Sequence, residues 1–320
     1  MNQVYILFLK TLRKIYSKAF KIKNNKTLCE QDPEKAFGLI YNALLTDKPI
    51  MIARFGSTEM ACLCNYVGVK QSDRNVFKFI SGQAQPWWWE SSIINQMQNW
   101  SGFFPPKIEK IEQFGELMLN DMKEIDILGS WINEDLFFKK ELNNCIKLNL
   151  ELLNPFFSMQ PWTKALERKK VLVIHPFAET IQKQYLKRGL LFKDNLLPEF
   201  ELKTIKAVQS IAGNKTEFND WFEALDYMKA EIDKTDYDIC LIGAGAYGLP
   251  LSAHVKRRGK KAIQLGGSLQ LLFGIKGARW ENPNYNPNYN YAALMNEHWV
   301  RPDEKEKPKN AEVVEGGCYW

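Results

Sequence analysis

Short apolar runs alternate with amphipathic segments along most of this chain. The runs are continuously apolar instead of alternating with polar residues, which is typical of strands buried on both faces of a sheet. They lie at 49–54, 125–131, 170–175, 201–208, 238–242 and 261–265. The pattern predicts an α/β fold with a Rossmann-like, mostly parallel sheet of about six strands and helices on both faces.

Helices are predicted in the segments between the strands, at 33–45, 59–66, 136–152, 178–187, 218–232 and 249–258. The first of them is marked by Asp32 at the N-cap and Pro33 at the first helical position. The stretch 81–106 is rich in Trp, Pro and Gly and follows no clear period. Residues 313–320 end in apolar and aromatic side chains, and we expect them to dock on the body of the protein.

The first 28 residues form a separate basic and amphipathic segment. They contain seven Lys and Arg residues and no acid, so they hold the whole of the net charge of +6. The segment is too short in its apolar part to span a bilayer and has no signal-peptide pattern. We therefore expect an amphipathic helix at 1–28 that contacts a membrane surface or, alternatively, packs on its own domain, and a single domain at 29–320. Its apolar residues recur at helical spacing: Val4, Phe8, Leu12, Ile15, Tyr16, Ala19 and Phe20.

Composition narrows the class of protein. A hydrophobic content of 45% and a charged content of 25% are ordinary for a globular chain. The six cysteines are scattered, so free thiols in a cytoplasmic protein are expected, and three histidines do not favour a His-rich metal site. Beyond residue 28 the sequence has no basic patch, so nucleic acid is not expected as a partner. Neither a P-loop nor a nucleophile elbow is present.

A glycine-rich turn follows the predicted strand 238–242. Gly243, Gly245 and Gly248 have the G-x-G-x-x-G spacing, with Tyr247 inside the turn. Such glycines let the backbone approach a ligand closely, and the helix that follows presents its N–H groups to a phosphate. The turn therefore predicts a nucleotide or another phosphorylated ligand, and a tight turn without a ligand is the alternative.

A second glycine pair, Gly266 and Gly267, follows the neighbouring strand and favours the ligand interpretation. The carboxyl ends of parallel strands share one edge, where open α/β sheets bind ligands. A dinucleotide site would also need an acid about 20 residues beyond the turn to hold the ribose. No Asp or Glu lies between Asp238 and Glu281, so NAD is not expected.

The first predicted strand runs into Arg54, Gly56, Ser57 and Glu59. A guanidinium suits phosphate or carboxylate, and glycine permits a sharp turn. Glu59, at the start of a helix, is a candidate metal ligand or base. The alternative is an ordinary strand-to-helix turn in which Glu59 favours the helix dipole.

His175 ends another strand, and Glu179 lies in the first turn of the next predicted helix. Both are candidate acids or bases, with structural roles as the alternative. Lys276 and Arg279 follow the last helix, where cations can meet a phosphate, and Ser210 ends a strand. A group of tryptophans offers faces for sugar rings or ordinary core packing: Trp87, Trp88, Trp89, Trp100 and Trp131.

Several of these segments resemble bacterial glycosyltransferases with the GT-D fold. The resemblance is seen in the segments IARFGSTE, VLVIHPFAETI, the glycine turns at 243–248 and 266–267, LLFGIKGARW and VEGGCYW. The resemblance implies a Rossmann-like domain and transfer of a sugar from a nucleotide-sugar donor. The acceptor would be a glycan or a lipid-linked molecule in bacterial surface-polysaccharide synthesis. Together with the basic segment at 1–28, this leads us to expect a cytoplasmic protein that is peripheral to the membrane.

The positions of the turns and the resemblance together give expected roles for individual residues. Catalysis is assigned to Glu59, His175 and Glu179, and a divalent metal, Mn²⁺ or Mg²⁺, to Glu59. In the family pattern the glycine is followed by Asp-x-Glu, whereas this chain has Ser57-Thr58-Glu59, so a single carboxylate carries over. A non-catalytic nucleotide-binding scaffold of a polysaccharide assembly complex and an NAD(P)-dependent oxidoreductase are the alternatives. Nucleotide-sugar binding is assigned to Arg54, Gly56, Ser57, Gly243, Gly245, Tyr247, Gly248, Gly266, Gly267 and Lys276.

Overall fold

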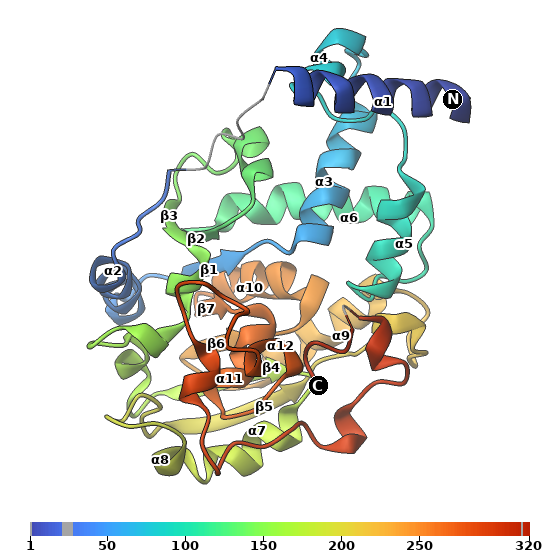
Figure 1. Cartoon of the computed structure of the whole chain (residues 1–320). Helices are drawn as coiled ribbons and strands as arrows, with labels where there is room; N and C mark the ends of the chain where they lie inside the picture. The colour runs from blue at the N-terminus through green and yellow to red at the C-terminus, as the bar shows by residue number, and fades with distance from the viewer. Residues whose placement is uncertain (1, 21–27, 315) are drawn as a thin grey trace.

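The computed structural model of the chain describes residues 2–20, 28–314 and 316–320. Within these residues seven strands form one parallel sheet with the order β3-β2-β1-β7-β6-β4-β5 (Figure 1). The predicted α/β fold with a Rossmann-like sheet is confirmed. The strands are β1 (Ile50–Arg54), β2 (Ile127–Ser130), β3 (Ile146–Asn149), β4 (Lys170–His175), β5 (Glu201–Lys206), β6 (Ile239–Ile242) and β7 (Lys261–Gln264).

Helices cover both faces of the sheet. On one face lie α3 (Ser57–Lys70), α5 (Ser91–Asn99), α6 (Ile108–Asp121), α9 (Trp221–Lys234) and α10 (Gly248–Arg257). On the other lie α2 (Pro33–Leu45), α7 (Ala178–Tyr185), α8 (Arg188–Leu191), α11 (Leu269–Leu272) and α12 (Ala278–Glu281). Leu172 and Ile174 of β4 point into the first layer, and Val171 and Val173 point into the second. This double burial explains the continuous apolar runs.

The order in which the chain adds strands to the sheet reverses beside β1. From β1 the chain proceeds outward through β2 to β3, whereas β7 returns to the opposite side of β1. Ligands of open α/β sheets bind outside the carboxyl ends of strands at such a switch point. The turns that follow β1, β7, β6 and β4 are therefore placed together at one edge.

The prediction of a helix at 136–152 is wrong. This segment contains a 3-10 helix at Asn133–Phe138, then β3, and a second 3-10 helix at Leu150–Leu153. In β3 Leu148 is buried while Ile146 is exposed, as expected for a short strand at the edge of the sheet. Pairing of β3 with β2 decided the conformation, and the helical spacing of the apolar residues did not. The sheet therefore gains a seventh strand.

The N-terminal helix α1 (Gln3–Ala19) confirms the helix predicted there. It packs through Ile6 and Leu9 against Phe79 and Trp88, beside the short helix α4 (Val76–Ile80). Most of the predicted apolar stripe instead faces outward. The rest of the predicted basic segment, including Lys21, Lys23 and Lys26, lies outside the described residues. Of the helices that the structure describes, none combines the length and the apolar character needed to cross a membrane.

Candidate functional site

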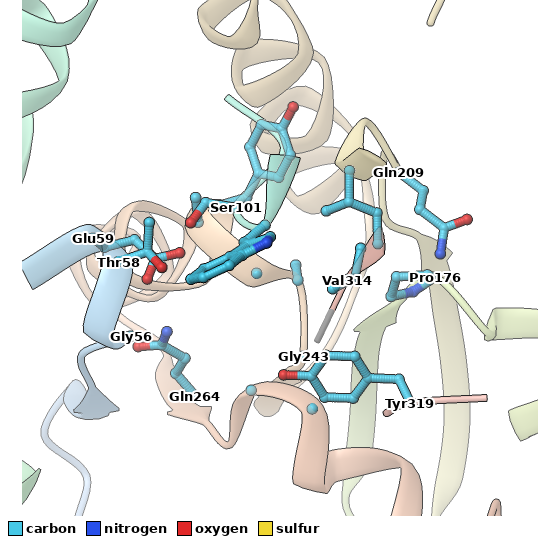
Figure 2. A pocket seen from close by; sticks show the side chains of 18 of the residues that line it. Gly56, Thr58, Glu59, Ser101, Pro176, Gln209, Gly243, Gln264, Val314 and Tyr319 are labelled. Carbon is cyan, nitrogen blue, oxygen red and sulfur yellow. The ribbon is translucent and has the colours of Figure 1, made fainter. Parts of the chain in front are cut away.

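A cleft opens at the carboxyl edge of the sheet, where the turns after β1, β4, β6 and β7 meet. It encloses about 200 Å³. Figure 2 shows Thr58 and Glu59 on one wall, Pro176 and Gln209 on the other, and Tyr319 extending across the space between them. Ten of the thirteen positions assigned to catalysis or to nucleotide-sugar binding line it: Arg54, Gly56, Ser57, Glu59, His175, Gly243, Gly245, Tyr247, Gly266 and Gly267.

Arg54 places a positive charge in this cleft. It is the last residue of β1, and its backbone N–H donates to Gln264 Oε1 at 3.3 Å. The Arg54 Nε is shut off from solvent and has no hydrogen-bond partner. Among the described residues no carboxylate forms an ion pair with the guanidinium, and burial lowers the pKa of Arg54. A largely buried cation without an ion-pair partner is costly, so this side chain is suited to binding an anion.

The glycine turns bring three strand ends into contact. A Cβ on Gly243 would lie 2.6 Å from the Gly266 carbonyl oxygen and 2.6 Å from His175 Cδ2, so only glycine fits there. Gly266 has a φ of +64°, and a Cβ on it would lie 2.9 Å from Arg54 Nη1. These close approaches hold the turns after β6 and β7 against Arg54 and His175.

Tyr247 supports the glycine turn from behind. Its ring stacks on Trp221 with centroids 4.8 Å apart and planes 7° apart, and its hydroxyl lies 3.3 Å from Ser210 Oγ. The turn forms a short 3-10 segment, Gly245–Tyr247, and α10 begins at Gly248. The stacked ring fixes the backbone that faces the cleft.

Glu59 lies at the start of α3, close to the helix N-cap. A Cβ on Gly56 would lie 1.8 Å from Glu59 Oε2, so the carboxylate folds back over the glycine at the N-cap. Ser57, the first residue of α3, is exposed at the cleft. Glu59 is the one carboxylate among the described residues that line the cleft.

The set of donor atoms does not suit a resident metal. Nowhere in the described part of the chain do three or more His, Cys, Asp or Glu side chains gather in a way that could hold a metal ion. Mg²⁺ is usually held by one or two carboxylates together with phosphates and water. With Glu59 as the one carboxylate among the described residues of the cleft, a divalent ion would depend mainly on ligands from the donor's phosphates. The metal requirement stays a prediction.

His175 is almost fully buried in the cleft wall at the end of β4. Its Nδ1 accepts a hydrogen bond of 3.0 Å from the Phe177 N–H, so the proton of the neutral ring is on Nε2. Burial lowers the pKa of His175 to about 3. The ring is therefore neutral near pH 7, where Nε2 can donate a hydrogen bond to a ligand. This environment suits a ligand contact better than the predicted acid role.

The stability of the protein is expected to fall with acid through His175. The unfolded ring binds a proton below about pH 6.5, whereas the folded ring stays neutral down to about pH 3. Above pH 6.5 the contribution of His175 to the free energy of unfolding is constant. Between pH 6.5 and about pH 3 the free energy of unfolding falls by about 1.4 kcal/mol per pH unit through His175. His175→Asn, which retains an acceptor for the Phe177 N–H, should show a shallower fall in denaturant unfolding.

Asp121 also changes the stability in part of this pH range, so the effect of His175 is taken as the difference between wild type and His175→Asn. Burial raises the pKa of Asp121 to about 6, above its ordinary 3.8, which stabilises the folded state as the pH falls between these values. Since Asp121 is present in both proteins, its effect cancels between wild type and His175→Asn. Parallel slopes for the two proteins would contradict the assignment of a neutral, buried His175.

Three predicted positions lie away from the cleft. Glu179 is half-exposed at the start of α7 and forms an ion pair of 3.7 Å with Lys206. Lys276 lies after α11 and does not line the cleft. Gly248 instead allows α10 to pack closely on β7, because a Cβ there would lie 2.7 Å from Gln264 Nε2. The predicted catalytic role of Glu179 and the predicted ligand contacts of Lys276 and Gly248 therefore have no support from their positions.

The segment 311–320 supplies residues that the sequence did not identify as part of the site. Its backbone follows the start of α12, with the Arg279 N–H donating to the Cys318 carbonyl at 3.1 Å. Tyr319 fits against Gly267, where a Cβ would lie 2.1 Å from Tyr319 Cε1. The Arg279 guanidinium lies 5.0 Å from the centre of the Tyr319 ring and lines the same cleft. The predicted docking of this segment is confirmed for its described residues.

Two tryptophans expose their rings at the cleft. Trp131 and Trp100 are 50% and 41% exposed, far more than the other large aromatic residues of the core. Trp131 is held in place by a hydrogen bond of 3.0 Å from its Nε1 to the Phe55 carbonyl oxygen. Its ring lies 5.4 Å from the Arg54 guanidinium. A fixed, exposed ring beside a cation is suited to a base or a sugar next to a phosphate.

Comparison with known proteins gives one match. A family model described as "GT-D fold-like domain" matches residues 31–272, which include every strand of the sheet. No curated protein and no solved structure matches the chain. The matched range contains the turns of Arg54, His175, Gly243 and Gly266, and it ends before Arg279 and Tyr319.

Proposed function

Because the chain belongs to the GT-D fold-like family, we propose that it is a glycosyltransferase that takes its sugar from a nucleoside diphosphate donor. The observation that carries this proposal is the guanidinium of Arg54, which faces the cleft beside two glycine turns and has no ion-pair partner among the described residues. A diphosphate supplies the missing negative charge. Arg279, which lines the same cleft, adds a second cation.

The family supports a transferase more directly than a dehydrogenase. The acceptor that we propose is a glycan or a lipid-linked molecule in bacterial surface-polysaccharide synthesis. In the transfer the acceptor hydroxyl loses its proton and forms a bond to the anomeric carbon. The bond from that carbon to the diphosphate breaks, and the nucleoside diphosphate leaves with the electron pair. Cations fixed at the leaving oxygen stabilise the charge that develops there.

We propose that Glu59 accepts the proton of the acceptor hydroxyl. It is the one carboxylate among the described residues of the cleft, and it lies on the wall opposite Gln209, within the electrostatic influence of Arg54 (Figure 2). A carboxylate can accept the proton of a sugar hydroxyl as its oxygen attacks. His175, neutral and with its proton on Nε2, would donate a hydrogen bond to the donor.

The proposed reaction is tested by release of nucleoside diphosphate. The full chain is incubated with single donors, with and without membranes from bacteria that make surface polysaccharide, and the released diphosphate is measured. Release that depends on one donor and increases with the membranes supports the proposal. Binding of a donor without any release would instead indicate the non-catalytic scaffold, and reduction of NAD(P) would indicate an oxidoreductase.

Trp131 is expected to contribute to donor affinity through stacking. Loss of a stacked base costs about 1–3 kcal/mol, so Trp131→Ala should weaken binding of the nucleoside diphosphate by roughly 5- to 150-fold. Trp131→Phe keeps a ring and should lose much less. Calorimetric titration measures the affinity of both variants. Trp88 packs against α1, away from the cleft, so Trp88→Phe is the control. Equal affinities of wild type and Trp131→Ala would remove this ring from the site.

A further inference from the structure

Helix α1 has two apolar faces, and the described residues cover only one of them. Ile6 and Leu9 are buried against Phe79 and Trp88. On the opposite side of the helix lies the outer face, which we define by Val4, Leu7, Phe8 and Ile15 together with Lys14 and Lys18. At 100° per residue these positions fall on one side of the helix, away from Ile6 and Leu9.

The apolar residues of the outer face are unusually exposed. Val4, Leu7, Phe8 and Ile15 keep 73%, 66%, 55% and 59% of their surface accessible. Several exposed apolar residues on one face of a helix mark an interaction site, whereas single exposed apolar residues need no explanation.

The charge beside these apolar residues is positive only. Lys14 and Lys18 are exposed, and neither forms an ion pair with any of the described residues. The first 28 residues of the sequence contain no acid. Lys10, on the flank of the outer face, does pair with Glu90 at 2.6 Å, which ties the helix to the body of the protein. The free charge thus lies on the outer face, next to the apolar residues.

We propose that the outer face of α1 binds the surface of an anionic lipid bilayer. Helix α1 lies lengthwise along one end of the molecule (Figure 1), and the apolar residues of its outer face are exposed. An interfacial helix of this kind inserts its apolar residues at the boundary of headgroups and acyl chains while flanking lysines contact anionic headgroups. The surface is separate from the cleft, so this proposal does not depend on the identity of the donor.

The test is flotation of the full chain with lipid vesicles. Vesicles of phosphatidylcholine alone are compared with vesicles that also contain phosphatidylglycerol, at low and high salt. We expect binding that requires phosphatidylglycerol and weakens with salt, because the lysine contribution is electrostatic. Lys14→Gln with Lys18→Gln should weaken the binding at least about tenfold, since each lysine near an anionic surface contributes roughly a factor of five. Leu7→Ser with Phe8→Ser should also weaken it.

A matched control exists at the other end of the molecule, around α8 (Figure 1). Leu186 and Leu190 are 82% and 54% exposed, and Lys187 and Lys193 are exposed beside them. Leu186→Ser with Leu190→Ser, and Lys187→Gln with Lys193→Gln, should leave vesicle binding unchanged. All substituted positions are exposed, and circular dichroism checks that each variant is folded.

Three results would overturn the proposal. The first is an absence of wild-type binding to phosphatidylglycerol vesicles. The second is an equal loss of binding in the variants of the outer face and in the controls around α8. The third is a change of oligomeric state in Leu7→Ser with Phe8→Ser, seen by light scattering without vesicle binding, which would assign the face to a second copy of the chain.

Discussion

Replacing Arg54 by Met should abolish donor binding while leaving the unliganded protein as stable as before. The guanidinium has no carboxylate partner in the described structure, and its Nε is sealed without a hydrogen bond. Loss of two charge-assisted hydrogen bonds, each about 1.5–3 kcal/mol, predicts nucleoside diphosphate binding at least about 100-fold weaker. A buried charge without a partner costs stability, so the free energy of unfolding should stay constant or rise by about 1 kcal/mol.

Calorimetric titration and denaturant unfolding measure the two halves of this prediction separately. Lys276→Met is the matched control, because it removes a cation that the structure places outside the cleft. Its binding should equal that of wild type. If Arg54→Met lost several kcal/mol of stability, Arg54 would be a structural residue, and if Lys276→Met lost binding, the anion site would lie elsewhere.

Replacing Glu59 by Gln should reduce turnover by about 100- to 10,000-fold while donor binding changes little. The reason is that a general base acts on the acceptor in the transition state, and its removal costs this range of rate. Gln keeps the size of the side chain that folds over Gly56, so the start of α3 should be preserved. The measurements are the rate of diphosphate release and the dissociation constant of the donor.

Titration with Mn²⁺ separates the base from a metal ligand. If Glu59 ligated a metal that bridges the diphosphate, Glu59→Gln would weaken donor binding and raise the Mn²⁺ concentration needed for turnover. Ser57→Asp restores the second acid of the family pattern and is the matched gain-of-function variant. A variant Ser57→Asp with new Mn²⁺-dependent turnover would show that the wild-type site is weakened in metal binding. Full turnover by Glu59→Gln would contradict the assigned role.

The sequence predicted most of the sheet and four of the turns that form the cleft. This was possible because continuous apolar runs report double burial locally, and because the carboxyl ends of parallel strands must share an edge. Four such runs end at or just before Arg54, His175, Gly243 and Gly266, and these residues meet in the structure. Their convergence is a consequence of topology that the strand pattern already contains.

Other features depend on contacts that no local pattern records. The edge strand β3 was predicted as part of a helix because four residues carry too little periodicity, and pairing with β2 decides their conformation. Tyr319 enters the cleft only because the segment 311–320 folds back along α12, more than 50 residues from the glycine pair it contacts. Glu179 occupies a promising sequence position, but its helix directs it toward Lys206 and away from the cleft.

The faces of α1 show the same limit. Helical spacing identified an apolar stripe that includes Val4, Phe8 and Ile15, but the residues that pack on the protein are Ile6 and Leu9. The helix has apolar residues on two sides, and only Phe79 and Trp88 decide which side is covered.

The measurement that tests the central claim most directly is the thermal stability of the wild-type chain and of Arg54→Met with a panel of ligands. The panel contains UDP-, GDP- and dTDP-sugars, CMP-sugars and NAD(P), each with and without Mn²⁺. A ligand at about 100 times its dissociation constant stabilises a protein by about 2.7 kcal/mol. We predict that a nucleoside diphosphate sugar stabilises the wild type and fails to stabilise Arg54→Met. Stabilisation by NAD(P) alone, or equal stabilisation of both proteins by the donor, would contradict the claim that this cleft binds a nucleoside diphosphate sugar through Arg54.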